Sequence, residues 1–167
     1  MKPSTQIVEQ QFNIAIDFDG VWTHEGAVIT RKALVELFAS VLRRDETGEY
    51  WLQTPVEKGR IAVADVPFIV TSWRIEQMGT KDQRLYLADN LGRETGVDGR
   101  HPLVLRIPRG KCGPFVPYHQ IGESIEARMS RSVYYALIDV ALQQGEPSDG
   151  CLQITSFETS HPLGIVS

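Results

Sequence analysis

Residues 27–53, AVITRKALVELFASVLRRDETGEYWLQ, and residues 127–153, ARMSRSVYYALIDVALQQGEPSDGCLQ, align without a gap when the chain is shifted by 100 residues. Seven of these 27 positions carry the same residue, where average composition would give roughly one or two by chance. The identical pairs are Ala27/Ala127, Arg31/Arg131, Leu37/Leu137, Leu42/Leu142, Glu46/Glu146, Leu52/Leu152 and Gln53/Gln153. The chain therefore carries an internal duplication, and this duplication decides the fold that we expect.

The matched positions also share structural roles. Thr30 and Ser130 each precede an amphipathic stretch and are residue types that cap helix N-termini. The dipeptide Leu-Gln at 52–53 and at 152–153 lies in a segment typical of a strand. The repeated unit is thus strand, helix and strand, and two such units suggest a cleft between two halves.

Alternating apolar and polar residues predict strands through most of the remaining chain. Helices are expected after Thr30 and after Ser130, and Arg43 and Arg44 suit the last turn of the first helix. Its expected buried face comprises Ala33, Leu34, Leu37, Phe38, Val41 and Leu42. Short strands with hairpin connections and two helices predict an α+β fold.

Composition limits the class of protein. The chain has 167 residues, a net charge of −4 and a pI of about 5.6, so we expect no nucleic-acid partner, because such binding draws on clustered Lys and Arg. Cys112 and Cys151 form no CxxC pair, and the first residues are polar. No apolar run approaches the ~20 residues that span a bilayer. We therefore expect a cytoplasmic protein without a membrane span and with free thiols.

The stretch Ile14–Val21, IAIDFDGV, resembles the first motif of the haloacid-dehalogenase phosphatases. That resemblance implies a Mg²⁺-dependent phosphohydrolase in which Asp17 attacks phosphorus and Asp19 is the acid/base. The spacing argues against this alternative, because only seven residues separate Lys81 from Asp89, whereas a parallel crossover takes about a dozen. The competing interpretation is a β-hairpin that turns at the second aspartate.

A second resemblance covers most of the chain. Its motifs are Asp19–Gly26 (DGVWTHEG), Arg31–Leu42, Tyr50–Leu52, Thr54–Lys58 (TPVEK) and Asp65–Phe68 (DVPF). In the second half, the matching residues are His101–Leu103, Tyr118 and Arg131–Tyr135. On these motifs the chain resembles the bacterial family called domain of unknown function 1285.

The family resemblance implies a duplicated fold with two antiparallel sheets, each packed on one helix. It implies an N-terminal repeat over residues 1–67 and a C-terminal repeat over 68–167, the latter similar to a pleckstrin-homology-like barrel. It also implies a signalling protein that binds a nucleotide-like ligand at the interface between its halves. No activity is established for the family, so the resemblance assigns no reaction.

Nine residues are candidates for ligand binding. Trp22 and His24 share a strand face, since side chains alternate with period two, and an aromatic ring beside an imidazole suits a purine or a sugar. Lys58 suits a phosphate and Glu57 a ribose hydroxyl. For each residue the alternative is an ordinary structural role in packing, a turn or an ion pair. The candidates are Trp22, His24, Glu25, Thr54, Glu57, Lys58, His101, Tyr118 and Arg131.

These observations favour a non-enzymatic ligand-binding or signalling module over the Asp17/Asp19 phosphohydrolase. The third alternative is a module that binds a protein partner through a barrel face. The four histidines show no HxH or HExxH spacing, so we predict neither a metal site nor catalytic residues. The sequence leaves the cofactor unidentified.

Overall fold

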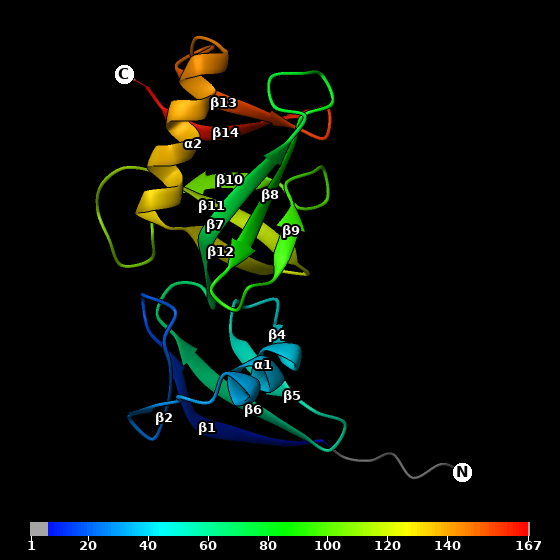
Figure 1. Cartoon of the computed structure of the whole chain (residues 1–167). Coiled ribbons are helices and arrows are strands. Elements are labelled where there is room, and N and C mark those ends of the chain that lie inside the picture. Colours follow the sequence, from blue (N-terminus) through cyan, green and yellow to red (C-terminus); the bar gives the residue numbers. More distant parts are fainter. Residues whose placement is uncertain (1–6, 167) are drawn as a thin grey trace. The chain divides into compact units, whose positions relative to one another are not determined.

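Strand-forming segments dominate the chain, and the computed structural model, which describes residues 7–166, divides it into two compact units (Figure 1). Unit 1 is Met1–Asp65 and unit 2 is Val66–Ser167. The elements of unit 1 are β1 (Val8–Ile16), β2 (Trp22–His24), β3 (Ala27–Val28), α1 (Lys32–Ser40), β4 (Leu42–Arg44), β5 (Tyr50–Gln53) and β6 (Glu57–Val63). Those of unit 2 are β7 (Phe68–Glu76), β8 (Arg84–Asp89), β9 (Glu94–Gly96), β10 (Leu103–Arg106), β11 (Val116–Gly122), β12 (Ile125–Met129), α2 (Arg131–Gln144), β13 (Cys151–Ser156) and β14 (Thr159–Ile165).

Unit 1 is one six-stranded sheet in the order β3-β2-β1-β6-β5-β4. Neighbouring strands are antiparallel except for β1 and β6, which run parallel at the centre. One face of the sheet packs on α1, where the ring of Trp22 stacks on that of Phe38 with centroids 6.3 Å apart. The other face carries the alternate side chains of the same strands, as the pleat requires.

Unit 2 contains a second six-stranded sheet in the order β10-β11-β12-β7-β8-β9, with β12 and β7 as its parallel central pair. The edge strands β9 and β10 are joined by residues 97–102 alone. Five strand spacings would separate the edges of a flat sheet by roughly 24 Å, and a turn between Asp98 and His101 shortens the reach of this connection. The sheet therefore curls into a half-barrel (Figure 1).

The two sheets share one plan. Each consists of two three-stranded antiparallel meanders joined through a central parallel pair. In unit 1 the helix lies between the meanders in sequence, whereas in unit 2 it follows the second meander and precedes the β13–β14 hairpin. The predicted α+β fold with two similar halves is confirmed, but the two sheets are mixed and not antiparallel throughout as expected, because a central parallel pair joins the two meanders of each.

Helix α1 differs from its prediction at both ends. Its N-cap is Arg31, without a side-chain hydrogen bond, so the prediction of Thr30 as the cap is wrong. The helix ends at Ser40, and residues 42–44 form β4 because they pair with β5. The buried face contains Val35 and Ala39, whereas Leu37 is 60% exposed. Tertiary pairing thus overrides the helical signal of the two arginines at the end of the predicted helix.

Helix α2 follows its prediction closely. Ser130 is the N-cap, and its side chain accepts a hydrogen bond from the Val133 N–H at 3.4 Å. The helix buries Val133, Leu137 and Ala141. It lies along the β13–β14 hairpin of its own unit (Figure 1). Within residues 7–166, no helix is both long enough and apolar enough to cross a membrane.

Three hairpins of the two sheets use one turn design. In each, an aspartate carboxylate accepts the backbone N–H groups two and four residues further on at 2.9–3.1 Å. The glycine three residues on has a positive φ of 79–88°, a conformation that glycine adopts without steric cost. The turns begin at Asp17 (β1–β2), Asp45 (β4–β5) and Asp89 (β8–β9).

The β13–β14 hairpin has a different turn. Ser156 pairs with Thr159, so Phe157 and Glu158 form a two-residue loop. Their φ values are +50° and +61°, as a type I′ turn requires, but neither residue is the Asn or Gly that this turn favours. The turn is therefore held in a costly backbone conformation by the contacts of its side chains.

Candidate functional site

The outer face of the unit 1 sheet, opposite α1, carries two cations stacked on one indole ring. Trp51 on β5 is in register with Arg60 on β6, and Lys58 lies two residues before Arg60 on the same face. The Lys58 Nζ lies 4.2 Å from the centroid of the Trp51 ring, and the Arg60 Cζ lies 4.9 Å from it. Such contacts draw a cation to the negative face of the ring.

The orientation of the indole is fixed from the neighbouring turn. The Trp51 Nε1–H donates to the Asp45 Oδ2 at 2.8 Å. The Asp45 carboxylate also accepts from the hydroxyl of Thr47 at 2.7 Å and from the backbone of the same turn. We call the four side chains of Asp45, Trp51, Lys58 and Arg60 the Trp51 cluster.

Hydrogen bonds lower the pKa of Asp45 far below its usual range, chiefly the bond from the Thr47 hydroxyl and then that from Trp51. Because the folded state favours the ionised carboxylate, its contribution to stability is complete above the unfolded pKa of about 4. The contribution is lost as the pH falls below that value towards the lowered pKa of the folded state. The cluster should therefore loosen in acid.

We expect the Asp45→Asn variant to be less stable than the native chain at pH 7, with the difference shrinking below pH ~4, where the Asp45 carboxylate takes up a proton in the unfolded state but stays ionised in the folded state. Urea unfolding followed by tryptophan fluorescence between pH 7 and pH 3 measures this. The Glu46→Gln variant is the matched control, since it removes the same charge from the exposed neighbouring residue. A stability difference that stays constant with pH would contradict the role given to Asp45.

The charges of the cluster are weakly compensated. Among the described residues, Lys58 has no carboxylate within ion-pair distance, and Arg60 reaches Glu49 only at 4.0 Å. The Arg60 side chain is 48% exposed. The ring therefore holds both cations with little compensation by carboxylates.

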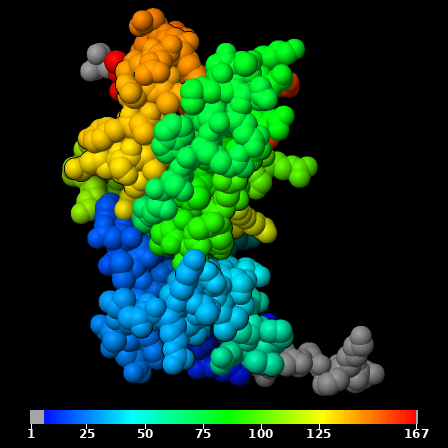
Figure 2. Space-filling view, viewed as in Figure 1, coloured from blue at the N-terminus to red at the C-terminus, as the bar shows by residue number. Residues whose placement is uncertain are grey.

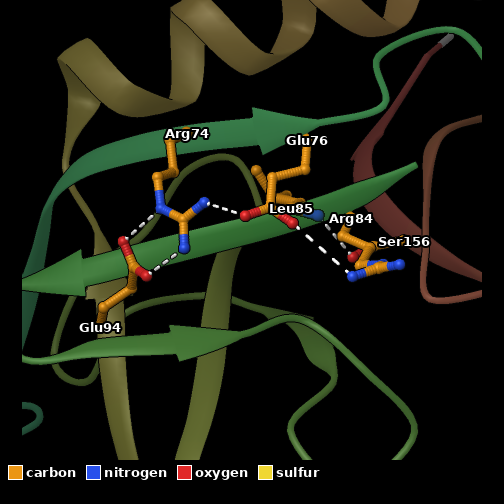
Figure 3. Close-up of polar contacts among 6 residues, drawn as sticks. All are labelled: Arg74, Glu76, Arg84, Leu85, Glu94 and Ser156. Carbon is orange, nitrogen blue, oxygen red and sulfur yellow. Dashed lines mark hydrogen bonds and ion pairs between the residues drawn. The ribbon is translucent and has the colours of Figure 1, made fainter. Parts of the chain in front are cut away.

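Arg74 in unit 2 provides the contrast, and Figure 3 shows its partners. Its guanidinium lies 4.0 Å from the centroid of the Tyr86 ring, but it also bonds Glu94 at 2.6 and 2.8 Å and Glu76 at 2.6 Å. The Glu94 carboxylate first, and then that of Glu76, raises the pKa of Arg74 above its ordinary value. Here a stacked cation is neutralised, so its surroundings offer nothing to an anion.

The predicted residues of β2 lie away from Lys58. Trp22 is buried against Phe38 on the α1 side of the sheet, and its Nε1 has no hydrogen-bond partner among the described residues. His24 pairs with Ile14, whereas Lys58 pairs with a residue five positions earlier on β1, roughly 16 Å along the strand. Glu25 lies in the turn after β2, with φ +51°. The structure does not bring these residues together with Lys58.

Thr54 and Glu57 make the turn that precedes Lys58. The Thr54 Oγ1 accepts the Glu57 N–H at 3.1 Å. The Glu57 Oε2 accepts from the side chain of Gln10 at 3.0 Å. Both residues therefore serve the β5–β6 turn and lie next to the Trp51 cluster in sequence.

The predicted residues of unit 2 lie in separate groups. The His101 Nδ1 lies 3.0 Å from the Asp98 Oδ1 in the β9–β10 connection. Tyr118 is fully buried, and the Arg106 guanidinium lies 3.8 Å from its ring centroid. Arg131 begins α2 and is exposed.

The alternative with Asp17 and Asp19 as catalytic carboxylates is not supported by the fold. It requires a doubly wound parallel sheet, but β1 leads directly into the antiparallel strand β2. The Asp17 Oδ1 accepts the N–H groups of Asp19 and Val21 and so shapes the turn. Within residues 7–166, no group of three His, Cys, Asp or Glu side chains is arranged to hold a metal ion.

Sequence reasoning selected Lys58 but missed Asp45, Trp51 and Arg60. The available signal was the pair of basic residues at positions 58 and 60, which a strand places on one face. Which aromatic ring lies beneath them depends on the register of β5 with β6, and this register is set by the turn between them.

Comparison with known proteins gives two family matches. "Domain of unknown function (DUF1285), N-terminal domain" matches residues 4–66, and "Protein of unknown function (DUF1285), C-terminal domain" matches residues 67–163. No curated protein matches the chain.

Two solved structures share the fold. A DUF1285 family protein from Silicibacter pomeroyi DSS-3 is 29% identical, with a TM-score of 0.84 over 96% of this chain and 85% of that one. A DUF1285 family protein from Shewanella baltica OS155 is 23% identical, with a TM-score of 0.59 over 77% of this chain and 92% of that one.

Proposed function

The chain belongs to the DUF1285 family, and because that membership names no activity, we propose from its geometry that unit 1 binds a small phosphate-bearing ligand of nucleotide-like chemistry at the Trp51 cluster. The role is that of a ligand-binding or signalling module rather than an enzyme. The observation that carries the proposal is the pair of cations stacked on Trp51 with little carboxylate compensation.

The chemistry of the two cations suits a phosphate. A lysine ammonium binds phosphate as a point charge, and an arginine guanidinium presents parallel N–H groups that match two phosphate oxygens. The ring of Trp51, itself held by Asp45, restricts both side chains before the ligand arrives. Such preorganisation reduces the entropy lost on binding.

The neighbouring residues suit the rest of a nucleotide-like ligand. Gln53 is in register with Lys58 on the same sheet face and offers an amide donor and acceptor. Glu57, in the adjoining turn, is the candidate for a ribose hydroxyl. A cytoplasmic location agrees with the free thiols of Cys112 and Cys151.

Isothermal titration calorimetry with ATP, NAD⁺, a cyclic dinucleotide and inorganic pyrophosphate, each with and without Mg²⁺, tests the proposal. We expect binding that weakens with added salt, because the contacts are exposed charges. The Lys58→Gln and Arg60→Gln variants should each bind at least tenfold more weakly, since a hydrogen bond to a charged group contributes about 1.5–3 kcal/mol.

The Lys32→Gln variant is the matched control. Lys32 lies in the same unit, is 68% exposed and pairs with Glu36 at 3.6 Å, so its loss removes one charge away from the cluster. Binding that falls equally in the Lys32 and Lys58 variants would show a general effect of charge and reject the site. Absence of binding by every probe would reject the ligand class.

A further inference from the structure

The turn of the β13–β14 hairpin is docked on the half-barrel of unit 2. We define the hairpin tip as residues 155–161. The Ser156 Oγ accepts the backbone N–H of Leu85 at 2.9 Å (Figure 3), and the Phe157 N–H donates to the carbonyl of Gln83 at 3.0 Å. In the view of Figure 2, the β7–β8 region (green) covers one side of the visible face of unit 2, and the α2 region (yellow to orange) covers the other.

The ring of Phe157 packs directly against Gly96, where a larger residue would leave it no space. A Cβ on Gly96 would lie 2.9 Å from the ring of Phe157. The same ring meets Tyr86 edge to face, with centroids 5.6 Å apart. These contacts hold Phe157 and Glu158 at positive φ, so undocking would let the loop relax to conformations that cost less.

Two buried histidines lack full hydrogen bonding here: His161 belongs to the tip, and His119 lies on β11, which contacts β14. His119 on β11 is 1% exposed and His161 on β14 is 2% exposed. The His119 Nε2 lies 3.3 Å from the carbonyl oxygen of Gly96, to which it donates. The His119 Nδ1 and the His161 Nε2 are buried and have no partner within the described residues. A proton added at either atom would place a charge in an apolar interior.

The groups around the two histidines act on their protonation in both directions. Burial, the main cause, and the neighbouring imidazoles of His101 and His161 together lower the pKa of His119 to about 4, while the backbone carbonyls of Gly96 and His101 act in the opposite direction. Burial also lowers the pKa of His161, while the carboxylate of Asp98 acts in the opposite direction. The Asp98 carboxylate also interacts with the His101 imidazole, so it does not act on His161 alone.

From these contacts we propose that the hairpin tip is a pH-sensitive latch, docked on β8 and β9 at neutral pH and released in mildly acidic solution when His119 and His161 take up protons. Unit 2 stays folded during the release. The released tip exposes both imidazoles to water, and the strained loop relaxes. The acidic form therefore presents the backbone of β8 and β9 that the tip covers.

The direction of the effect follows from linkage. A histidine with a lowered pKa binds fewer protons when docked than when released, where its pKa returns to about 6.5. Docking is therefore complete above pH 6.5 and weakens as the pH falls towards the lowered values. The equilibrium constant for release rises by up to about tenfold per pH unit for each histidine.

Nuclear magnetic resonance of the full chain between pH 7.5 and pH 4.5 tests the latch. We expect the amides of Leu85 and Phe157 to lose hydrogen-exchange protection, corrected for the intrinsic rate at each pH, as the imidazole signals of His119 and His161 titrate. The amides of the β7–β12 pair should stay protected. In the His119→Gln/His161→Gln variant, the tip amides should stay protected throughout, whereas the His24→Gln control should behave as the native chain.

Two results would overturn the proposal. Tip amides that remain protected to pH 4.5 would show that the tip is a fixed part of the fold. Loss of protection in the tip and the β7–β12 pair together would show unfolding of the whole unit. Should the double variant fail to fold, the native titration alone still separates these outcomes.

Discussion

Replacing Gln83 by alanine should lower the free energy of unfolding of unit 2 by about 3 kcal/mol. Gln83 is 1% exposed and joins three segments. Its Nε2 donates to the Thr155 carbonyl at 2.7 Å, and its Oε1 accepts from the Gly79 N–H at 2.9 Å and from the Gln144 Nε2 at 2.6 Å. Truncation leaves these groups without a partner in a buried place, which costs more than the bonds contribute when formed.

Urea unfolding at pH 7 measures this effect. The Gln120→Ala variant removes the same side chain from an exposed position on β11 and should stay within about 0.5 kcal/mol of the native chain. The Gln144→Ala variant should lie between the two, because it removes one partner of Gln83 and leaves the bond to Thr155. Equal stabilities for the Gln83 and Gln120 variants would show that the amide network adds nothing.

Replacing Trp22 by alanine should destabilise unit 1 by about 4 kcal/mol, the range for removing a buried aromatic ring. Trp22 is 3% exposed and stacks on Phe38. The Trp22→Phe variant keeps an aromatic ring in place and should lose much less, about 1 kcal/mol. Thermal unfolding of both variants measures the difference.

Leu37 supplies the control for Trp22. It is a large apolar residue of α1 but is 60% exposed, so the Leu37→Ala variant should cost less than about 0.5 kcal/mol. The Trp22→Phe variant should also retain ligand binding at the Trp51 cluster, because Trp22 lies on the other face of the sheet. A loss of binding in this folded variant would place Trp22 in the binding site and move the site away from Lys58.

The parts of the fold that depend on local sequence could be predicted. Ser130 marks the start of α2 because its side chain caps the helix, and this information lies within four residues. The start of β4 could not be predicted in this way, because Arg43 and Arg44 are ordinary helix residues and become a strand only by pairing with β5. The same holds for the parallel pairs, whose strands lie far apart in the chain.

The candidate site shows the same limit. Period-two alternation places Trp22 and His24 on one face of a strand, but it does not tell which face meets the helix. The charge of Lys58 can be read from the sequence, whereas its position over the ring of Trp51 depends on the register of β5 with β6. Side chains become neighbours across a sheet through the backbone hydrogen bonds that pair the strands. A local sequence pattern does not contain this pairing.

The parallel pair at the centre of unit 1 has a mechanical consequence. Strand β1 opens the unit and β6 closes it, and both run in the same direction from the Val8–Glu57 pair to the Ile16–Val63 pair. A tension applied between the two ends of the unit therefore pulls these neighbours along their length in opposite senses. Under that load the hydrogen bonds between the two strands are sheared together instead of opening one after another. We therefore expect this strand pair to provide most of the resistance of unit 1 to stretching.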